Sequence, residues 1–289
     1  TLFRSRNHAE NIGFRPGRYN AGLAFNFIYP FRAHIAGNVI ERVGAQGINV
    51  HSGKSSGMRG DMPFIRVLIH HNKVWKSMQN CCDYGGIEGW QHGPIYIFNN
   101  LSHDARGLRE YGRRQHTYAR GFGHAYYLDG GFKSYLFNNI AWGLSNDPSS
   151  KLVNCAAFQE IYSFQNMFFN NTAYNYAEGS RRQAPGGGRD KFLGNIFQDI
   201  SQWVLWHSPP NKARKEPNEA DARKDTKYDF STNAYADNVF FKYSDFPHDK
   251  GAFGCYLPDG SWLDSPDVFR RMLKATDTMV TSLGVVDDT

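Results

Sequence analysis

The sequence contains no apolar run long enough to span a membrane. A spanning helix needs about 20 consecutive apolar residues, and polar residues interrupt every stretch of this 289-residue chain sooner. We therefore expect no membrane span. The sequence begins with Thr1 and contains neither an initiating methionine nor a signal peptide. We therefore interpret it as a processed form or part of a longer chain.

Cysteine is scarce and lacks the spacing of a metal site. The four cysteines are Cys81, Cys82, Cys155 and Cys255, and none forms the CxxC pair that structural zinc uses. Neighbouring Cys81 and Cys82 would point to opposite faces of a strand, so at most one should face the core. Buried free thiols are favoured over disulfides.

Metal-binding histidine phrases such as HxH and HExxH are absent too, so we predict no catalytic metal and no cofactor, with calcium as a minor alternative. The net charge of +6 suits an anionic partner such as an acidic polysaccharide or a nucleic acid. Basic and acidic residues are mixed along the chain, however, and we predict no nucleic-acid binding.

The most informative feature that is present is a repeated phrase, in which asparagine follows an apolar, glycine or polar residue and precedes β-forming residues. Its spacing runs from 24 to 43 residues, and its instances centre on Asn38, Asn72, Asn99-Asn100, Asn138-Asn139, Asn170-Asn171, Asn195 and Asn238. Asparagine tolerates the left-handed conformation of a tight bend, and its amide can bond the same residue in the next coil. The phrase therefore predicts a ladder of stacked asparagines.

Short β-rich runs lie between these bends, for example residues 64–69, 94–98 and 134–137. A sandwich or propeller would not explain recurrent asparagine with such variable spacing. We predict an all-β, right-handed parallel β-helix with long rim loops. The polar residues 102–121, 179–191 and 208–226 are assigned to loops, and residues 266–274 to one short helix.

The predicted β-helix covers residues 1–243, and residues 244–289 form a C-terminal cap or an extension of the same domain. A solenoid needs capped ends, and the start shows no obvious cap. We therefore expect a further segment of the same protein to complete the solenoid.

From the asparagine phrase, residues 31–241 resemble the right-handed β-helix superfamily of carbohydrate-active proteins, which includes pectin-degrading enzymes and glycoside hydrolases. The phrases at residues 83–88 and 128–131 look most similar to β-helix glycosidases acting on fucosides or xylans. The resemblance implies a polysaccharide or oligosaccharide substrate and a secreted, periplasmic or cell-surface location.

Three segments, residues 47–51, 83–93 and 123–129, should be equivalent strands in successive coils, with outward side chains about 4.8 Å apart. Glycoside hydrolysis generally needs two carboxyl groups, and Asp83, Glu88 and Asp129 are the candidates. Acids on neighbouring coils would fit a retaining reaction, and a skipped coil would approach the inverting distance. The alternative is that all three are ordinary solvated turn residues.

Aromatic and histidine residues accompany these acids. Trp90 offers a flat face to a sugar ring, and His51, His92, His124 and Tyr127 are candidate hydrogen-bonding residues. Each has an ordinary structural role as its alternative.

Arg120 ends a basic stretch, residues 106–120, that either binds a carboxylated or sulfated sugar or is a solvated loop. The leading hypothesis is a glycoside hydrolase. One alternative is a polysaccharide lyase using His124, Tyr127, Arg120 or Lys133 against a uronic acid. The other is a noncatalytic glycan-binding β-helix.

Overall fold

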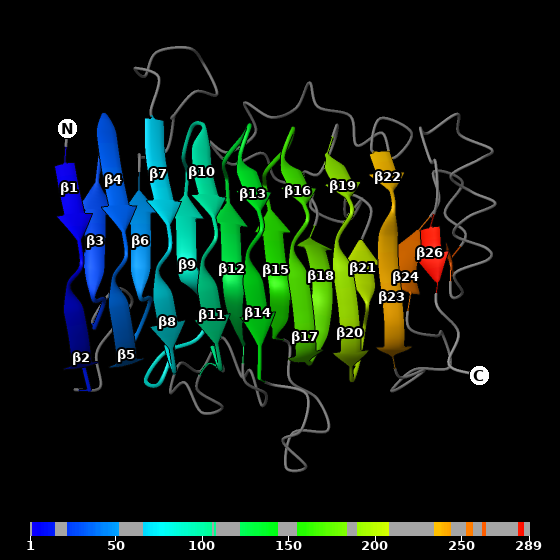
Figure 1. The fold of residues 1–289 in the computed structure, drawn as a ribbon, viewed down its shortest axis with the longest axis horizontal. Helices are drawn as coiled ribbons and strands as arrows, with labels where there is room; N and C mark the ends of the chain where they lie inside the picture. Colours follow the sequence, from blue (N-terminus) through cyan, green and yellow to red (C-terminus); the bar gives the residue numbers. More distant parts are fainter. Residues whose placement is uncertain are drawn as a thin grey trace, which may run out of the picture.

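The computed structural model describes residues 2–14, 22–51, 66–105, 107, 122–143, 155–183, 190–207, 234–243, 253–256, 262–263 and 283–285. Within these residues the secondary structure consists of β-strands, without any helix, and the strands form three sheets. Successive coils stack in parallel register along one axis (Figure 1). The fold is a right-handed parallel β-helix, which confirms the predicted class.

Each sheet takes one strand from each coil. Sheet A consists of β1 (Leu2–Ser5), β4 (Arg32–Ala36), β7 (Arg66–His70), β10 (Ile95–Phe98), β13 (Tyr135–Phe137), β16 (Met167–Phe169), β19 (Lys191–Leu193) and β22 (Ala234–Ala236). Sheet B consists of β2 (His8–Ile12), β5 (Val39–Val43), β8 (Lys73–Trp75), β11 (Leu101–His103), β14 (Ile140–Trp142), β17 (Thr172–Tyr176), β20 (Ile196–Ile200), β23 (Asn238–Tyr243) and β26 (Leu283–Val285).

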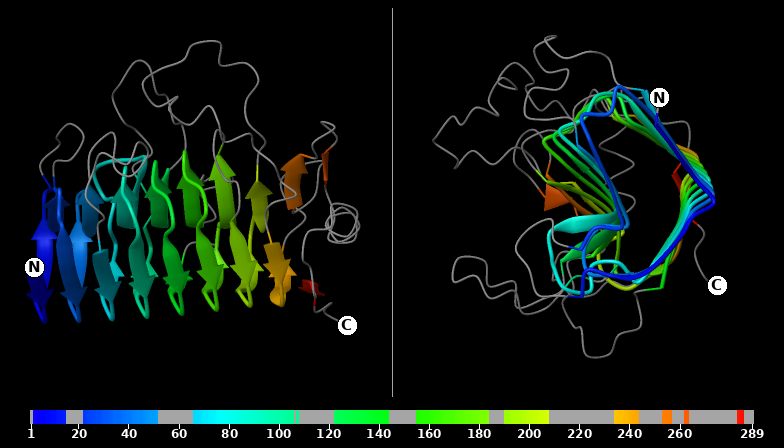
Figure 2. Two further views of the ribbon diagram at one scale, coloured as in Figure 1. Left: turned by 90° about the horizontal axis from the view of Figure 1, so that it is seen from above. Right: turned by 90° about the vertical axis from the view of Figure 1, so that its left-hand side faces the viewer.

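Sheet C is the third face of the solenoid, and it carries the candidate site. It consists of β3 (Phe25–Ile28), β6 (Ile48–His51), β9 (Tyr84–Trp90), β12 (Gly123–Asp129), β15 (Ala156–Ile161), β18 (Glu178–Gln183), β21 (Leu205–His207), β24 (Phe253–Tyr256) and β25 (Trp262–Leu263). Only the last pairing, β24 with β25, is antiparallel among the described strands. The end-on view in Figure 2 shows the coils superimposed, with the three sheets as faces.

The predicted asparagine ladder is present at the bend between sheets A and B. The side-chain amide of each ladder residue donates to the carbonyl oxygen of the next one at 2.8–3.1 Å, through Asn7, Asn38, Asn72, Asn100, Asn139, Asn171, Asn195 and Asn238. From Asn38 to Asn238 these side chains are almost fully buried, so the bonds satisfy amides that would otherwise be costly to bury. The ladder fixes the register of every coil it joins.

The ladder asparagine was also expected to adopt the left-handed conformation of the bend, but in the structure the residue before it adopts that conformation. Asn99, Asn138 and Asn170 have φ values of 53–54°, while the ladder residues follow them. Arginine, glycine, histidine or aspartate takes this position in the other coils, at Arg6, Gly37, His71, Gly194 and Asp237. In each Asn-Asn pair, the first asparagine therefore adopts the left-handed conformation and the second forms the ladder hydrogen bond.

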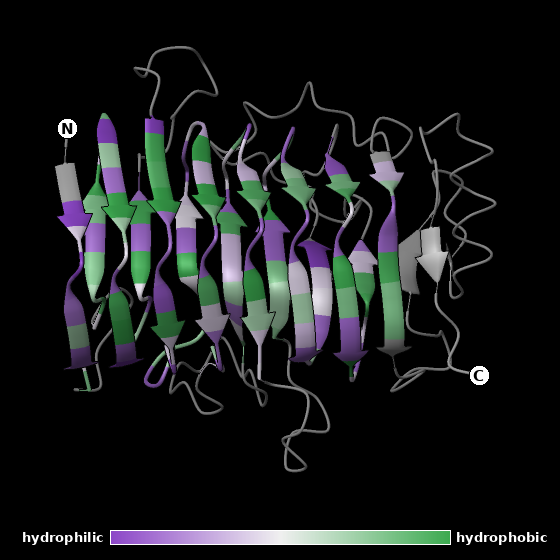
Figure 3. Ribbon diagram, in the orientation of Figure 1, coloured by the Kyte–Doolittle hydropathy of each residue, from purple (hydrophilic) through white to green (hydrophobic). Residues whose placement is uncertain are grey.

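The interior is filled by inward side chains that repeat from coil to coil. In sheet A one such row runs through Ile35, Ile69, Ile97, Leu136, Phe168, Phe192 and Tyr235, and all are buried. The rings of Phe168 and Phe192 stack at 4.8 Å. Burying each such side chain contributes roughly 1.5–3 kcal/mol. Along the strands in Figure 3, hydrophobic and hydrophilic segments alternate, as one-sided burial requires.

Two of the predicted loops were wrong in part. Residues 179–191 include most of β18 and the start of β19, and residues 102–121 begin inside β11. The error came from treating charge as a sign of a loop. In β18, Arg182 is buried inside the solenoid against Glu160, and Arg181 on the other face of the strand pairs with Glu178.

Cys81 and Cys82 lie between β8 and β9, not in a strand, and both are buried, which corrects the strand-based prediction of one inward thiol. The prediction of buried free thiols is confirmed for Cys81, Cys82 and Cys155. The expected loop at residues 208–226 and the expected helix at residues 266–274 lie outside the described residues. Of residues 244–289, β24, β25 and β26 are described, and they continue sheets B and C.

Candidate active site

The three segments expected to be equivalent strands are β6, β9 and β12, consecutive strands of sheet C. Asn49, Glu88 and Tyr127 occupy matching positions in them. Two residues further along, His51, Trp90 and Asp129 match in the same way. Inward Ile87 and Leu128 alternate with these residues and belong to the hydrophobic core, so the two rows point outward.

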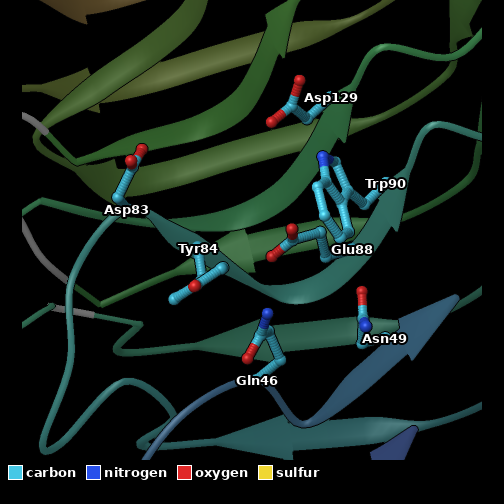
Figure 4. Close-up of a pocket in the computed structure, with 7 residues that line it drawn as sticks. All are labelled: Gln46, Asn49, Asp83, Tyr84, Glu88, Trp90 and Asp129. Carbon is cyan, nitrogen blue, oxygen red and sulfur yellow. The ribbon is translucent and has the colours of Figure 1, made fainter. Parts of the chain in front are cut away.

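A polar pocket opens on this outward face. It has a volume of about 290 Å³ and is lined by Gln46, Asn49, Asp83, Tyr84, Glu88, Trp90 and Asp129. That volume lies at the lower end of the range for small-molecule sites, about 300–1,000 Å³. All three predicted acids therefore line one pocket. In Figure 4 the side chains of Asp83 and Asp129 both lie above Glu88, with Asp83 to the left and Asp129 nearer to Trp90.

Glu88 is the central acid. Its side chain is almost fully buried, and one oxygen accepts a hydrogen bond from the backbone N–H of Gly85 at 2.9 Å. Burial raises the pKa of Glu88 well above its usual value. The hydrogen bond from Gly85 opposes this rise, the negative charges of Asp129 and Asp83 add to it, and the Gln46 hydrogen bond has the smallest, opposing effect. The protonated carboxyl form is thus favoured here.

Asp83 and Asp129 reach the pocket from different strand ends, although both belong to Asp and Gly-Gly phrases. Asp83 precedes β9 with a φ of 68°, a left-handed conformation that aspartate tolerates better than most residues. Asp129 ends β12, and Gly130 after it turns the chain with a φ of 73°. The two phrases are not structurally equivalent, because Asp129 pairs with Trp90.

The glycines of the first phrase are strand residues rather than turn residues. A β-carbon on Gly85 would lie 2.8 Å from that of Tyr127, and one on Gly86 would lie 2.6 Å from the Ser102 hydroxyl. Both contacts are too close for another residue type without local movement. Gly85 and Gly86 therefore let β9 pack closely against its neighbours beside Glu88.

Trp90 forms an aromatic wall of the pocket, and His51 packs against Trp90 without itself lining the pocket. The two rings stack with centroids 4.1 Å apart at 27°, and Tyr29 follows on the other side of His51 at 5.7 Å. Burial lowers the pKa of His51, so the neutral ring is favoured. His51 therefore supports Trp90 by packing against it.

Tyr127 lies directly beside Glu88 in the adjacent strand. Burial raises the pKa of its phenol well above the usual value, and the charges of Asp129, Asp83 and Glu88 raise it further while Arg181 opposes them. The phenol therefore stays protonated. Such a group donates a hydrogen bond, and it is a poor general base.

The remaining predicted residues lie elsewhere. His92 is buried, its Nδ1 hydrogen-bonds the Gly93 carbonyl at 2.7 Å, and its ring packs where β-carbons on Gly89 and Gly131 would stand. Since Gly89 belongs to the inward row of Val50 and Leu128, His92 lies on the inner side of sheet C. His124 is buried on β12 outside the pocket lining, and Arg120 falls outside the described residues.

Three pocket residues were missed by the sequence analysis, namely Gln46, Asn49 and Tyr84. Asn49 could have been found, because it occupies the position of Glu88 in the preceding coil. Tyr84 directly follows Asp83, but nothing in the local sequence shows that it lines the pocket. Gln46 precedes β6, where strand alternation gives no direction for a side chain.

Potential metal ligands gather elsewhere. Among the described residues, one group of three comes close enough for a shared ion, His8, Glu10 and Glu41. It lies on sheet B, and Arg42 forms an ion pair with Glu10 there. The pocket acids do not form such a group within the described part of the chain.

No protein-family model, curated protein or solved structure matches this chain. Across the described residues, the structure contains no helix with the length and apolar character needed to cross a membrane. Ideas about function therefore rest on the geometry and chemistry of the pocket.

Proposed function

We propose that this protein is a glycoside hydrolase of the right-handed β-helix carbohydrate-active superfamily, of the kind that acts on fucosides or xylans. The observation that carries the proposal is the convergence of Asp83, Glu88 and Asp129 in one polar pocket with an aromatic wall. Paired carboxyl groups supply the acid and the base or nucleophile of glycoside hydrolysis. The substrate is a polysaccharide or oligosaccharide, so we also propose a secreted, periplasmic or cell-surface location.

Glu88 is the proposed general acid, because its raised pKa favours a proton that can be given to the leaving oxygen. Asp129, which lines the same pocket as Asp83, is the proposed nucleophile or base. Glu88 and Asp129 stand on neighbouring coils with an offset of two residues. Strand spacing of about 4.8 Å and a rise of about 3.3 Å per residue place their Cα atoms roughly 8 Å apart.

The charge of the pocket favours a hydrolase acting on a neutral sugar over a uronate lyase. A lyase needs a positive group to neutralise the substrate carboxylate and a base to remove a proton. The pocket is lined by three acids, which would repel a uronate. Tyr127, one proposed lyase base, is held protonated.

The test is product analysis on fucosylated, xylan-type and uronic-acid polysaccharides, following reducing ends and ultraviolet absorbance together. We expect reducing ends without absorbance. Glu88→Gln should lower the rate about 10²- to 10⁴-fold, the usual contribution of a general acid. On an aryl glycoside, whose leaving group needs little protonation, the loss should be much smaller, whereas Asp129→Asn should impair both substrates.

Glu41→Gln is the matched control, since Glu41 lies on sheet B outside the pocket, and it should leave the rate unchanged. Ultraviolet-absorbing products would instead establish a lyase. Binding without turnover on every substrate, unchanged by Asp129→Asn, would establish a noncatalytic glycan-binding protein.

A further inference from the structure

The outward row of sheet C continues beyond the acid pocket. From Glu88 the matching positions in successive strands are Tyr127, Gln159, Arg181 and Trp206. Arg181 is three strands from Glu88, or roughly 14 Å at about 4.8 Å per strand. The pKa of Tyr127 is affected by the acids at one end of the row and by Arg181 at the other, in keeping with its position between them. One row thus joins a negative end and a positive end.

Arg181 is held in a preformed position. Its guanidinium carbon lies 4.3 Å from the centroid of the Trp206 ring and 5.4 Å from that of Phe122. The side chain is 7% exposed, and its Nη1 donates to Glu178 at 3.4 Å, a long contact. Two aromatic rings and one carboxylate therefore fix the plane of the guanidinium.

The Nε edge of this guanidinium has no hydrogen-bond partner in the structure. Two further polar atoms near it share this property, Nε2 of His124 and Oε1 of Gln159. Buried polar groups are nearly always bonded to protein, water or a ligand. Three such atoms on neighbouring strands of one face indicate that a polar group binds there.

The donors in this cluster define the charge of that group. Nδ1 of His124 accepts a hydrogen bond from the backbone N–H of Ala156 at 3.0 Å. Burial lowers the pKa of His124 well below its usual value, and Arg181 lowers it further. The ring is therefore neutral with its proton on Nε2. Arg181 and His124 each offer an N–H, which suits an anionic oxygen.

We propose that Arg181 and His124 form a second subsite that binds an anionic substituent, a carboxylate or sulfate, of the same polysaccharide whose neutral sugar occupies the acid pocket, while Oε1 of Gln159 accepts a hydrogen bond from a hydroxyl of the bound sugar. This inference rests on the proposed function and specifies its substrate as a polymer with both neutral and anionic groups. Burial in a medium of low dielectric strengthens recognition by the guanidinium.

The test is calorimetric binding of two matched ligand pairs. One pair is glucuronoxylan oligosaccharides and their carboxyl-reduced forms, and the other is sulfated fucan oligosaccharides and their desulfated forms. At least one anionic ligand should bind roughly 10- to 100-fold more tightly than its neutral form, as expected for hydrogen bonds to a charged group. The pair that shows the preference identifies carboxylate or sulfate as the group bound.

Arg181→Gln combined with Glu178→Gln removes both members of the ion pair and leaves no buried charge unpaired. This variant should lose the preference and bind the neutral ligands as the wild type does. Arg181→Lys keeps the charge but not the planar fork, so it should fold and show a reduced preference. Equal affinities in the wild type, or an undiminished preference in a folded variant, would overturn the proposal.

The two proposals fail in different ways. Hydrolysis without any preference for an anionic ligand would support the proposed hydrolase activity and contradict the proposed anion subsite. A preference that depends on Arg181, without turnover of any ligand, would support the anion subsite and remove the hydrolase.

Discussion

Two clusters of acids lie on opposite faces of sheet C, and they differ in their countercharge. The inner cluster is Glu160, Arg182 and Asp190, with Nε of Arg182 at 2.5 Å from Glu160 and Nη2 at 3.1 Å from Asp190. The outer cluster is Asp83, Glu88 and Asp129. A cation lies inside the first, whereas no basic side chain lines the pocket of the second.

The inner cluster has the features of a structural network. Asn166 donates to both acids, from its side chain to Glu160 at 3.0 Å and from its backbone to Asp190 at 2.7 Å. The pKa of Asp190 is raised well above its usual value by burial first and by Glu160 second, while Arg182 opposes the rise. The buried carboxyl groups around Arg182 therefore have a structural role, because their charge is neutralised within the fold. The carboxyl groups of the pocket have no such countercharge, and perturbed acids of this kind are candidates for binding or catalysis.

The largest expected effect is on the inner cluster. Arg182→Met should destabilise the protein by about 3–5 kcal/mol, because it leaves acids buried without their cation. Urea unfolding followed by circular dichroism measures this change. Lys191→Met, an exposed lysine on β19, is the control and should change stability by no more than about 0.5 kcal/mol. An equally small loss for Arg182→Met would remove the distinction between the clusters.

A smaller effect is expected for Asp190→Asn. The amide keeps the acceptor for the Asn166 backbone N–H and the size of the carboxyl group, but it loses the charged partner of Arg182. The expected destabilisation is about 1–3 kcal/mol, measured by the same unfolding experiment. Asp237→Asn, at an exposed bend position, should be neutral. A loss larger than that of Arg182→Met would show that Asp190 and not the arginine is the centre of the network.

The smallest effect concerns the outer cluster and its pH dependence. Because the folded-state pKa of Glu88 is raised, its ionisation opposes folding, and stability falls as pH rises from the unfolded value of about 4.3 toward the folded pKa. Glu88→Gln removes this loss. The variant should differ from the wild type by at most about 1 kcal/mol near pH 4 and become relatively more stable at higher pH.

Unfolding midpoints measured across pH, with Glu41→Gln as the control, test this expectation. A wild type that gains stability relative to Glu88→Gln with rising pH would show that Glu88 is stabilised as a carboxylate. The outer cluster would then resemble the inner one.

The fold was predictable because its signal repeats. Asn100, Asn139 and Asn171 each make the same ladder contact, so an error at one coil would not hide the pattern. The grouping of Glu88 and Asp129 followed from the same logic, since equivalent strands bring distant residues together. This logic did not place Asp83, which precedes the start of β9, whereas Asp129 is at the end of β12. The two acids line the same pocket although their positions in the strands are not equivalent.

The parts of the structure that the sequence did not predict depend on the direction of individual side chains. Arg181 and Arg182 are neighbours in sequence, and composition alone placed both in a loop. Their opposite directions in β18 put one on the outward row and the other in the interior. A fully buried arginine departs from the usual pattern of burial, and its ion pairs with Glu160 and Asp190 supply the countercharge there.

The asparagine ladder also has an evolutionary consequence. Successive ladder residues are separated by 24 to 43 positions, yet their contacts are the same. A coil can therefore lengthen its excursion or be copied whole without disturbing the coils on either side. Because the carboxylates of the pocket come from two neighbouring coils, the ladder contacts of Asn72, Asn100 and Asn139 keep those coils stacked whatever the length of the excursions between them.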